Sequence, residues 1–391
     1  MTRLEIDLET LVAWRRDLHR HPELAYEEHR TAAFVAERLH EFGLDEVHTG
    51  LAGTGVVGVL RAGRGNDAIG LRADMDALPI TEASGVPWAS ARRGLMHACG
   101  HDGHTAMLLG AAWHLARTRR FEGTVYFIFQ PAEEGRAGAR RMIEDGLFAR
   151  FPMRAVFGLH NWPWLPLGEF GVHRGEVMAA ADRFEIRLRG RGCHAAMPHL
   201  GRDPVVAVAA LIQVLQSLIS RETDPLRPAV LSVTRIRAGD AFNVVPDEAE
   251  CLGTVRIFDP VLRTRIRARM AEVVDHVAAA HGCSGSLDYR EGYPPTVNSA
   301  AEAEEAAAAA AAVAGAERVH HDPPPSMGAE DFAFMLEQKP GAYVWMGIGG
   351  AQEGRILHSP RYDFDDRALE TGVAYWVELV ERLLPRRAAA R

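Results

Sequence analysis

The chain has 391 residues, which exceeds the length at which one hydrophobic core stops growing, so we expect two domains. A formal charge of -8 argues against a nucleic-acid partner, because neutralising phosphates requires clustered basic surface. Four cysteines without close spacing argue against a disulfide framework and favour a cytoplasmic location. The N-terminus is acidic and no stretch reaches about 18 uninterrupted apolar residues, so we expect neither secretion nor a membrane span.

The first segment predicts two helices, over residues 5–20 and 27–42, separated at His21-Pro22 and ended by Gly43. The glycines at 53, 55 and 58 formally match a dinucleotide-binding fingerprint. That motif must open a helix, whereas the residues after it are β-branched and lead to another apolar run at 69–71. We therefore expect a hairpin of two strands here.

Two potential ligand clusters follow. Asp74 and Asp76 follow the strand at 69–71. Aspartates at this position could equally be ordinary turn residues or functional groups. Residues 96–105 then contain one cysteine, three histidines and one aspartate, which together indicate a metal site. We expect Cys99 and His101 to lie on an extended segment, and a helix from Thr105 to 116 capped by Asp102 or Thr105.

Two buried strands each end in potential ligands. Residues 124–129 are apolar throughout, as in a strand covered on both faces, and lead to Glu133 and Glu134. Residues 155–159 form a second such run, which ends in His160. In open α/β sheets the active crevice lies at the carboxyl ends of the strands, so these side chains are expected to converge.

From residue 184 the pattern changes to alternating strands, each with one wet face, and two long helices. The order is strand 184–189, helix 204–221, strands 230–237 and 250–258, helix 261–281 and strand 286–289, which predicts a ferredoxin-like α+β domain. Helices and strands alternate again after Pro294-Pro295. The alanine-rich segment 300–315 is a predicted helix, residues 326–332 a helix cap, 342–348 a strand and 366–384 the last helix, with His358 in the preceding loop.

Six side chains at strand ends and in loops are enough to form a metal centre and to leave one carboxylate as a catalytic base: Cys99, His101, Glu133, Glu134, His160 and His358. Five such groups can hold two borderline divalent ions in mixed nitrogen, oxygen and sulfur coordination. One carboxylate then remains to take a proton from water and pass it to a leaving amine.

Several motifs resemble the dinuclear-metal amidohydrolases of the hippurate hydrolase and indole-acetyl-amino-acid hydrolase type, within the aminoacylase and carboxypeptidase family. The similarity runs from Arg15 to the last helix and rests on His97-x-Cys99-Gly-His101-Asp102-x-His104, Gln130-Pro-Ala-Glu133-Glu134, Gly158-x-His160, Gly192-x-His194 and Met327-Gly-Ala-Glu-Asp-Phe. The resemblance implies an α/β fold, with a mixed, largely parallel catalytic sheet flanked by helices and an inserted ferredoxin-like dimerisation domain. The expected boundaries are 1–181 and 293–391 for the catalytic domain and 182–292 for the insertion.

The resemblance also implies residue roles. It assigns Cys99, His101, Glu134, His160 and His358 as ligands of two divalent ions, which could be Zn, Mn, Co or Ni, with Cys99 bridging them, and Glu133 as general base and acid. Asp76 would orient a ligand, Asp74 has no settled role, and His97 and His104 would support the centre.

The inserted domain would form a homodimer or a higher homo-oligomer and contribute His194 and Asn243 to oxyanion stabilisation. Without the resemblance, His194 and Asn243 would be interpreted as turn residues. Arg256 is a candidate clamp for a substrate carboxylate, although an arginine at a strand end is more often simply solvated.

We therefore predict metal-dependent hydrolysis of the amide bond in small N-acyl amino acids. A dipeptidase or carboxypeptidase of the same family would use identical chemistry, and a non-enzymatic metal-binding or ligand-binding protein could share the scaffold. A serine or cysteine hydrolase is disfavoured because the chain has no G-x-S-x-G motif and Cys99 has acidic and metal-binding neighbours.

Overall fold

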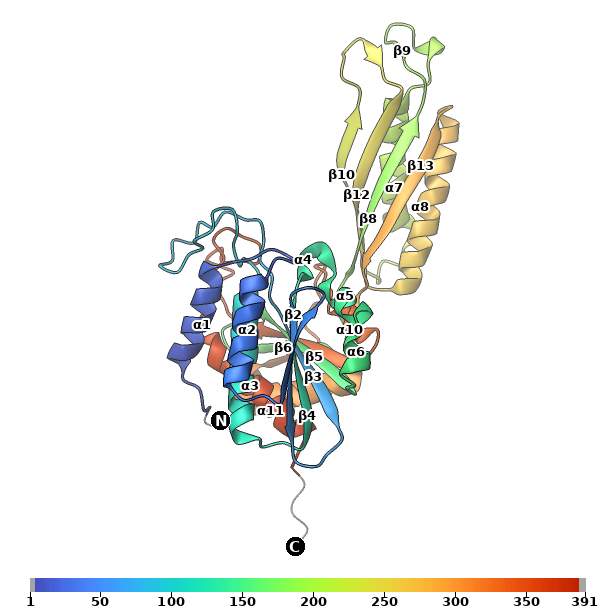
Figure 1. Cartoon of the computed structure of the whole chain (residues 1–391). Coiled ribbons are helices and arrows are strands. Elements are labelled where there is room, and N and C mark those ends of the chain that lie inside the picture. Colours follow the sequence, from blue (N-terminus) through green and yellow to red (C-terminus); the bar gives the residue numbers. More distant parts are fainter. Residues whose placement is uncertain (1–3, 387–391) are drawn as a thin grey trace. The chain divides into compact units, whose positions relative to one another are not determined.

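The computed structural model describes residues 4–386, which divide into two compact units (Figure 1). The second unit comprises Met178–Thr296 and Ser326–Glu330, and the first comprises the rest of the described chain. The predicted insertion, 182–292, falls inside the second unit. This unit also takes residues 178–181, 293–296 and 326–330, which the sequence had placed in the catalytic domain.

The first unit is built on an eight-stranded sheet with the order β1-β2-β4-β3-β5-β16-β6-β15. Its strands are β1 (Glu46–Leu51), β2 (Gly55–Ala62), β3 (Ala68–Asp74), β4 (Gly123–Gln130), β5 (Ala155–Trp162), β6 (Phe170–Val172), β15 (Val319–His321) and β16 (Gly341–Gly347). Strands β4, β3, β5 and β16 are parallel neighbours, whereas β1, β2 and β4 pair antiparallel. The predicted mixed, largely parallel sheet is thus confirmed.

One prediction for this sheet is wrong. Strands β2 and β3 follow one another in sequence but do not form a hairpin, because β4 lies between them and pairs with both. The apolar residues of β4 are buried, as predicted. This strand is an interior strand of the sheet and lies between β2 and β3. Of the glycines of the apparent dinucleotide motif, Gly53 lies in the turn before β2 and Gly55 and Gly58 lie in β2, so the motif does not open a helix.

Helices cover both faces of this sheet (Figure 1). One layer contains α1 (Leu8–Arg20), α2 (His29–Glu41), α3 (His101–Thr118), α9 (Ala300–Ala314) and α11 (Ala368–Leu383), and the other contains α5 (Gly138–Glu144), α6 (Leu147–Arg150) and α10 (Ala333–Leu336). Asp7 caps α1 by accepting a hydrogen bond from the Thr10 N–H at 2.8 Å. The predicted cap at 326–332 is not observed, because α10 has only four residues and no side-chain cap.

The second unit has the ferredoxin-like order that the sequence predicts. Its sheet runs β10-β12-β8-β13, with every neighbouring pair antiparallel. The elements are β8 (Ala180–Arg189), α7 (Pro204–Glu222), β10 (Ala229–Ala238), β12 (Glu248–Ile257), α8 (Pro260–Ala280) and β13 (Ser284–Tyr293). Both helices pack on one face, and the apolar residues of β8 alternate toward them.

Short elements complete the chain. Strands β9 (Cys193–His194) and β11 (Val244–Val245) pair with each other, as do β7 (Glu176–Met178) and β14 (Thr296–Val297); α4 (Glu133–Arg136), η1 (Pro198–Leu200) and η2 (Ala316–Arg318) are single turns. Within residues 4–386, α7 is the one helix whose length and mean hydropathy would allow it to cross a membrane. In this structure its residues Leu211, Leu215 and Leu218 are buried in the core of the second unit.

Candidate metal centre

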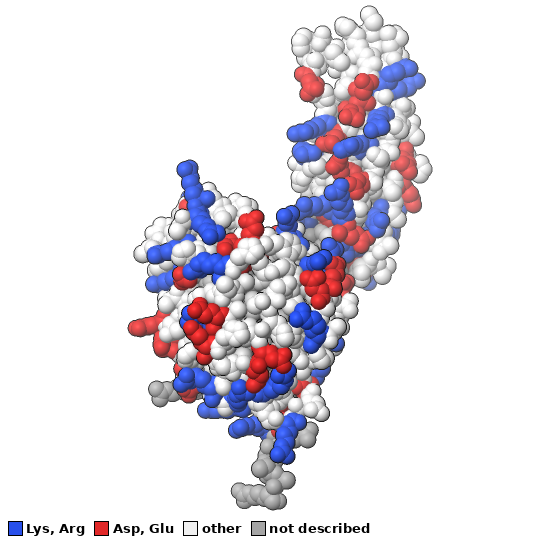
Figure 2. Space-filling model, viewed as in Figure 1, with Lys and Arg blue, Asp and Glu red and all other residues white. Residues whose placement is uncertain are grey.

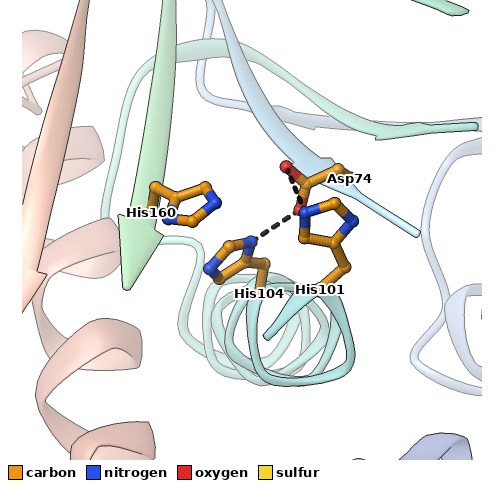
Figure 3. Close-up of side chains that lie close together, drawn as sticks. All are labelled: Asp74, His101, His104 and His160. Atoms are coloured by element: carbon orange, nitrogen blue, oxygen red, sulfur yellow. Dashed lines mark hydrogen bonds and ion pairs between the residues drawn. The ribbon is translucent and has the colours of Figure 1, made fainter. Parts of the chain in front are cut away.

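The carboxyl ends of β3, β4 and β5 lie at one edge of the first unit's sheet, because these strands are parallel neighbours. Asp74 ends β3, His160 lies near the end of β5, and Glu133 and Glu134 follow β4 after a two-residue turn. Strand-end positions that are far apart in sequence are thereby brought together, as Figure 3 shows for His160 and Asp74.

A buried cluster joins Asp74 to three imidazoles, those of His101, His104 and His160 (Figure 3). The His104 Nδ1 lies 2.6 Å from one carboxylate oxygen of Asp74, and the His101 Nε2 lies 3.6 Å from the other. Burial opposes ionisation of Asp74, but the nearby His101, Arg72 and His104 hold its pKa well below the usual value. Asp74, whose role the sequence left open, therefore lies among the imidazoles as an anion.

The two predicted histidine ligands of this cluster each present one ring nitrogen to the site. The Nδ1 of His101 bonds to Asp76 at 3.3 Å, and its buried Nε2 has no hydrogen-bond partner. The Nδ1 of His160 donates to the Asn161 carbonyl at 2.7 Å, which leaves Nε2 at 3.5 Å from the Cys99 thiol. A metal-binding histidine is typically oriented in this way, through its second nitrogen.

The remaining predicted ligands form an adjoining group. Cys99, Glu134 and His358 offer ligand atoms within 4.8 Å of one another, and so do His101, Glu133 and Glu134. His358 is held beside Cys99 because its N–H donates to the Ala98 carbonyl at 2.8 Å. Overlapping groups of this kind bring all five predicted ligands and Glu133 into one region of the first unit.

The segment that carries Cys99 and His101 differs from the prediction. Gly100 adopts a left-handed conformation with φ of 88°, and α3 starts at His101, so neither Asp102 nor Thr105 caps it. A side chain at Gly100 would place its Cβ 2.3 Å from both the Asn161 amide nitrogen and the Tyr362 hydroxyl. Glycine is thus required between the two ligands, and the backbone turns there where the sequence predicted an extended segment.

Buried ion pairs hold the first turn of α3. Asp102 accepts from His19 at 2.9 Å and lies 3.5 Å from Arg15, and the other nitrogen of His19 lies 3.3 Å from Glu82. Burial lowers the pKa of His19, but Asp102 and Glu82 outweigh this and raise it to about 9. Of the two predicted supporting histidines, His104 lies in the Asp74 cluster, whereas His97 is buried with neither ring nitrogen hydrogen-bonded.

The predicted groups of the second unit lie at two ends of its sheet. His194 and Asn243 lie side by side at the β9–β11 pair, where the Ala195 N–H donates to the Asn243 carbonyl at 3.0 Å. Exposed apolar residues surround them, Met197, Leu200, Phe242 and Val244, and this end is mostly uncharged in Figure 2. Arg256 lies elsewhere, in a hollow of about 400 Å³ on the open face of the sheet.

The chain matches the model of peptidase family M20/M25/M40 over residues 70–382. It belongs to this family. It is 41% identical to an N-acetyl-L-cysteine deacetylase of Bacillus subtilis (strain 168), over 96% of this chain and 88% of that one. It is 39% identical to a hippurate hydrolase of Campylobacter jejuni, over 95% of both chains. A solved structure, a dinuclear metal binding peptidase from the M20 family of Bacillus subtilis, has a TM-score of 0.84 and 38% identity, and covers 96% of this chain and 98% of that one.

Sequence reasoning missed the groups that support the centre of this family member. Arg72 is buried between Asp74 and Asp331, at 2.8 and 3.2 Å, and donates to Gln130 at 2.7 Å. An arginine in an otherwise apolar strand is the one signal that could have revealed this, since an unpaired charge is not tolerated there.

A second missed group is Glu28, which is fully buried and accepts from the Thr54 hydroxyl at 2.6 Å. Burial raises its pKa to about 7, partly offset by the Thr54 bond and reinforced by Asp76. Because the folded-state pKa lies above the usual 4.5, the contribution of Glu28 to stability is complete below about pH 4.5 and is lost as the pH rises through about 7.

The Glu28→Gln variant should not show this loss, because glutamine does not ionise. The free energy of unfolding of the variant, relative to that of the natural protein, should therefore rise by about 3 kcal/mol between pH 4.5 and pH 8. Urea unfolding of both proteins in chelator at several pH values measures the difference. Parallel stability curves over this range would contradict the raised pKa.

Proposed function

We propose that the chain hydrolyses the amide bond of N-acyl amino acids and releases a carboxylic acid and a free amino acid. The observation that carries the proposal is the buried Glu133 carboxylate, which lies beside His101 and Glu134 within a dense set of ligand groups. A binding protein would need the ligands but not this additional carboxylate. The similarity to a deacetylase and a hippurate hydrolase supports the same class of substrate.

The residues fit a centre for two divalent ions, held by Cys99, His101, Glu134, His160 and His358. The His101 Nε2 and the Glu134 Oε1 are buried polar atoms without hydrogen bonds, and they lie 3.6 and 3.2 Å from the potential ligand atoms of Asp74 and His358, as expected of atoms grouped around a cation site. Cys99 would serve both ions, because its thiol contacts His160 and also belongs to the group with Glu134 and His358. When bound, the ions would polarise the amide carbonyl and acidify a water; Zn, Mn, Co and Ni all suit these donors.

The chain's own groups divide the remaining tasks. Glu133 takes the proton of the attacking water and returns it to the leaving amine nitrogen. Asp76 accepts hydrogen bonds from both the His101 ring and the Glu134 N–H, at 3.3 and 2.9 Å, and so keeps two ligands in register. The Asp74–His104 pair fixes the neighbouring Asn161, whose N–H donates to His104 at 2.9 Å.

We further propose that the second unit dimerises and supplies His194 and Asn243 to stabilise the oxyanion, with Arg256 binding the substrate carboxylate. Arg256 pairs with Ala181 at the start of β8, whereas His194 follows the end of β8 at Arg189. Eight residues of strand span roughly 26 Å, which is longer than a small N-acyl amino acid. If both groups act on one substrate, they therefore come from two copies of the chain. The enzyme would act in the cytoplasm.

Stripping the protein with a chelator and restoring Zn, Mn, Co or Ni separately tests the function. We expect metal-dependent release of free amino acid from at least one of hippurate, N-acetyl amino acids and indole-acetyl amino acids. Faster cleavage of a dipeptide or of a peptide C-terminus would favour the dipeptidase or carboxypeptidase alternative. Tight metal binding without turnover of any of these compounds would favour a binding protein.

The Cys99→Ala variant tests the ligand set. Removing a thiolate that contacts both ligand groups should lower the metal content per chain clearly, as measured by elemental analysis after dialysis. Cys251→Ala is the matched control, since Cys251 is buried in the core of the second unit. Full occupancy in Cys99→Ala would contradict ligation by this residue.

A further inference from the structure

The turn that carries Glu133 and Glu134 has an unusual backbone conformation, which is closed on itself by a hydrogen bond from the Gly138 N–H to the Ala132 carbonyl at 3.0 Å. Glu134 and Gly135 have non-helical backbone angles, so α4 is not a regular helical turn. Ala132 and Ala137, on either side of it, adopt left-handed conformations with φ of 57° and 56°. Such a conformation costs about 1–2 kcal/mol for a residue with a Cβ, so contacts from outside the turn that favour it offset a real cost.

Three buried carboxylates provide contacts of this kind by accepting backbone N–H groups along the segment. Glu28 accepts from Ala132 at 2.8 Å, Asp76 from Glu134 at 2.9 Å and Asp331 from Ala139 at 2.9 Å. Asp76 also contacts the ligand His101, and Asp331 also contacts the buried Arg72. Substitution of Asp76 or Asp331 would therefore disturb the metal ligands or the core as well as the turn.

Glu28 is the carboxylate whose contact can be tested separately. Its second oxygen is tied to the Thr54 hydroxyl, in the turn between β1 and β2, and its side chain is fully buried. Two residues earlier, the Tyr26 hydroxyl donates to the Arg136 carbonyl at 2.8 Å. The 26–28 segment thus contacts the turn on both sides of Glu133 and Glu134.

We propose that Glu28, assisted by Tyr26, is a positioning residue that fixes the left-handed Ala132 and so directs the adjacent Glu133 carboxylate at the substrate. The expected effect on kcat rests on the proposed function, whereas the expected effect on the conformation of the turn does not. Because Asp76 separately holds the Glu134 N–H, loss of the Glu28 contact should move the base while the metal ligands stay in place. Displacement of a reacting group by about 1 Å can reduce a rate about 100-fold.

The test compares Glu28→Ala and Glu28→Gln with a matched control, Glu23→Ala. Glu23 is a buried carboxylate of the same segment and also accepts backbone N–H groups, those of Arg30 and Thr31 at 3.1 and 2.9 Å. These groups belong to the first turn of α2 and not to the 131–136 turn. Glutamine at position 28 keeps an oxygen for the Ala132 N–H and can donate to Thr54.

Three quantities are measured on the metal-loaded proteins: kcat and KM, metal content, and hydrogen exchange of the peptide that contains residues 131–137. Glu28→Ala should lower kcat about 100-fold with KM and metal content little changed, and should accelerate exchange of this peptide at least tenfold. Glu28→Gln should restore both. Glu23→Ala should lower the unfolding midpoint but leave kcat and this exchange rate unchanged.

Unchanged exchange in Glu28→Ala would overturn the positioning role, and so would an equal loss of kcat in Glu23→Ala. Accelerated exchange with natural kcat would overturn its link to catalysis. The exchange result stands even if the natural protein hydrolyses none of the amides offered, so failure of the proposed function is distinguishable. If Glu28→Ala does not fold, the Tyr26→Phe variant tests the proposal from the other side of the turn. We expect faster exchange of the 131–137 peptide and a severalfold loss of kcat in this variant. Unchanged values of both would overturn the proposal.

Discussion

Replacing Glu133 with glutamine is expected to reduce kcat about 1000-fold while the metal content per chain stays that of the natural protein. Glutamine has the same shape and keeps an oxygen for the Asp331 N–H, which lies 3.4 Å from Glu133 Oε1, so the local structure should persist. The variant cannot accept the proton of the attacking water at this position, and proton transfer by a positioned side chain contributes about 100-fold to 10000-fold. Steady-state kinetics with elemental analysis of the same sample measures both quantities.

The matched control for this change is Glu144→Gln, on the nearby helix α5, whose carboxylate is exposed. It should leave kcat and metal content as they are. Turnover of Glu133→Gln within about fivefold of the natural rate would refute the assignment of the base. Loss of metal from Glu133→Gln would instead identify Glu133 as a ligand.

Arg72→Met should have the largest effect on stability, lowering the free energy of unfolding by about 3–5 kcal/mol. The Arg72 side chain is 1% exposed and forms ion pairs with the buried carboxylates of Asp74 and Asp331, which would each lose this partner. Methionine fills similar space but offers no hydrogen bond to Gln130. Urea unfolding in the presence of a chelator separates this loss from any change in metal binding.

Arg61→Met is the control for this prediction. Arg61 is also a strand arginine with an acidic partner, but its side chain is 51% exposed and its ion pair with Glu46 lies at the surface. An exposed pair contributes at most about 1 kcal/mol, so this variant should unfold close to the natural protein. Equal destabilisation by both substitutions would show that the buried network around Arg72 is not special.

Much of the fold follows from local patterns. The alternating residues of β8 indicated a strand with one solvent-exposed face, and the apolar residues of β4 indicated a strand buried on both faces. Both burial patterns are observed. The predicted hairpin of β2 and β3 was wrong because strands that follow one another in sequence need not pair. The hydrogen bonds of a strand can be satisfied by any neighbouring strand whose apolar and polar residues match in register. The start of α3 was also missed, since the space beside the left-handed Gly100 is filled by Asn161 and Tyr362, which are distant in sequence.

The metal centre was predictable to the extent that its groups follow strands. Glu133, Glu134 and His160 could be placed at one sheet edge from strand ends alone, and the family resemblance added the division of roles. The contacts of Glu28 and Arg72 were not predictable, because their partners Ala132 and Asp331 are about 100 and 260 residues away. The roles of His194, Asn243 and Arg256 stay predictions.

The position of β16 has a consequence for the order in which the protein can be completed during synthesis. This strand lies between β5 and β6, although residues 341–347 are made about 180 residues after β5, and the whole second unit is made in between. Until β16 emerges from the ribosome, the apolar edge of β5 has no partner on that side, and such edges favour incorrect pairing. His358 is made later still, so a truncated or stalled chain lacks one member of the proposed ligand set. Tight metal binding would therefore distinguish finished chains from unfinished ones.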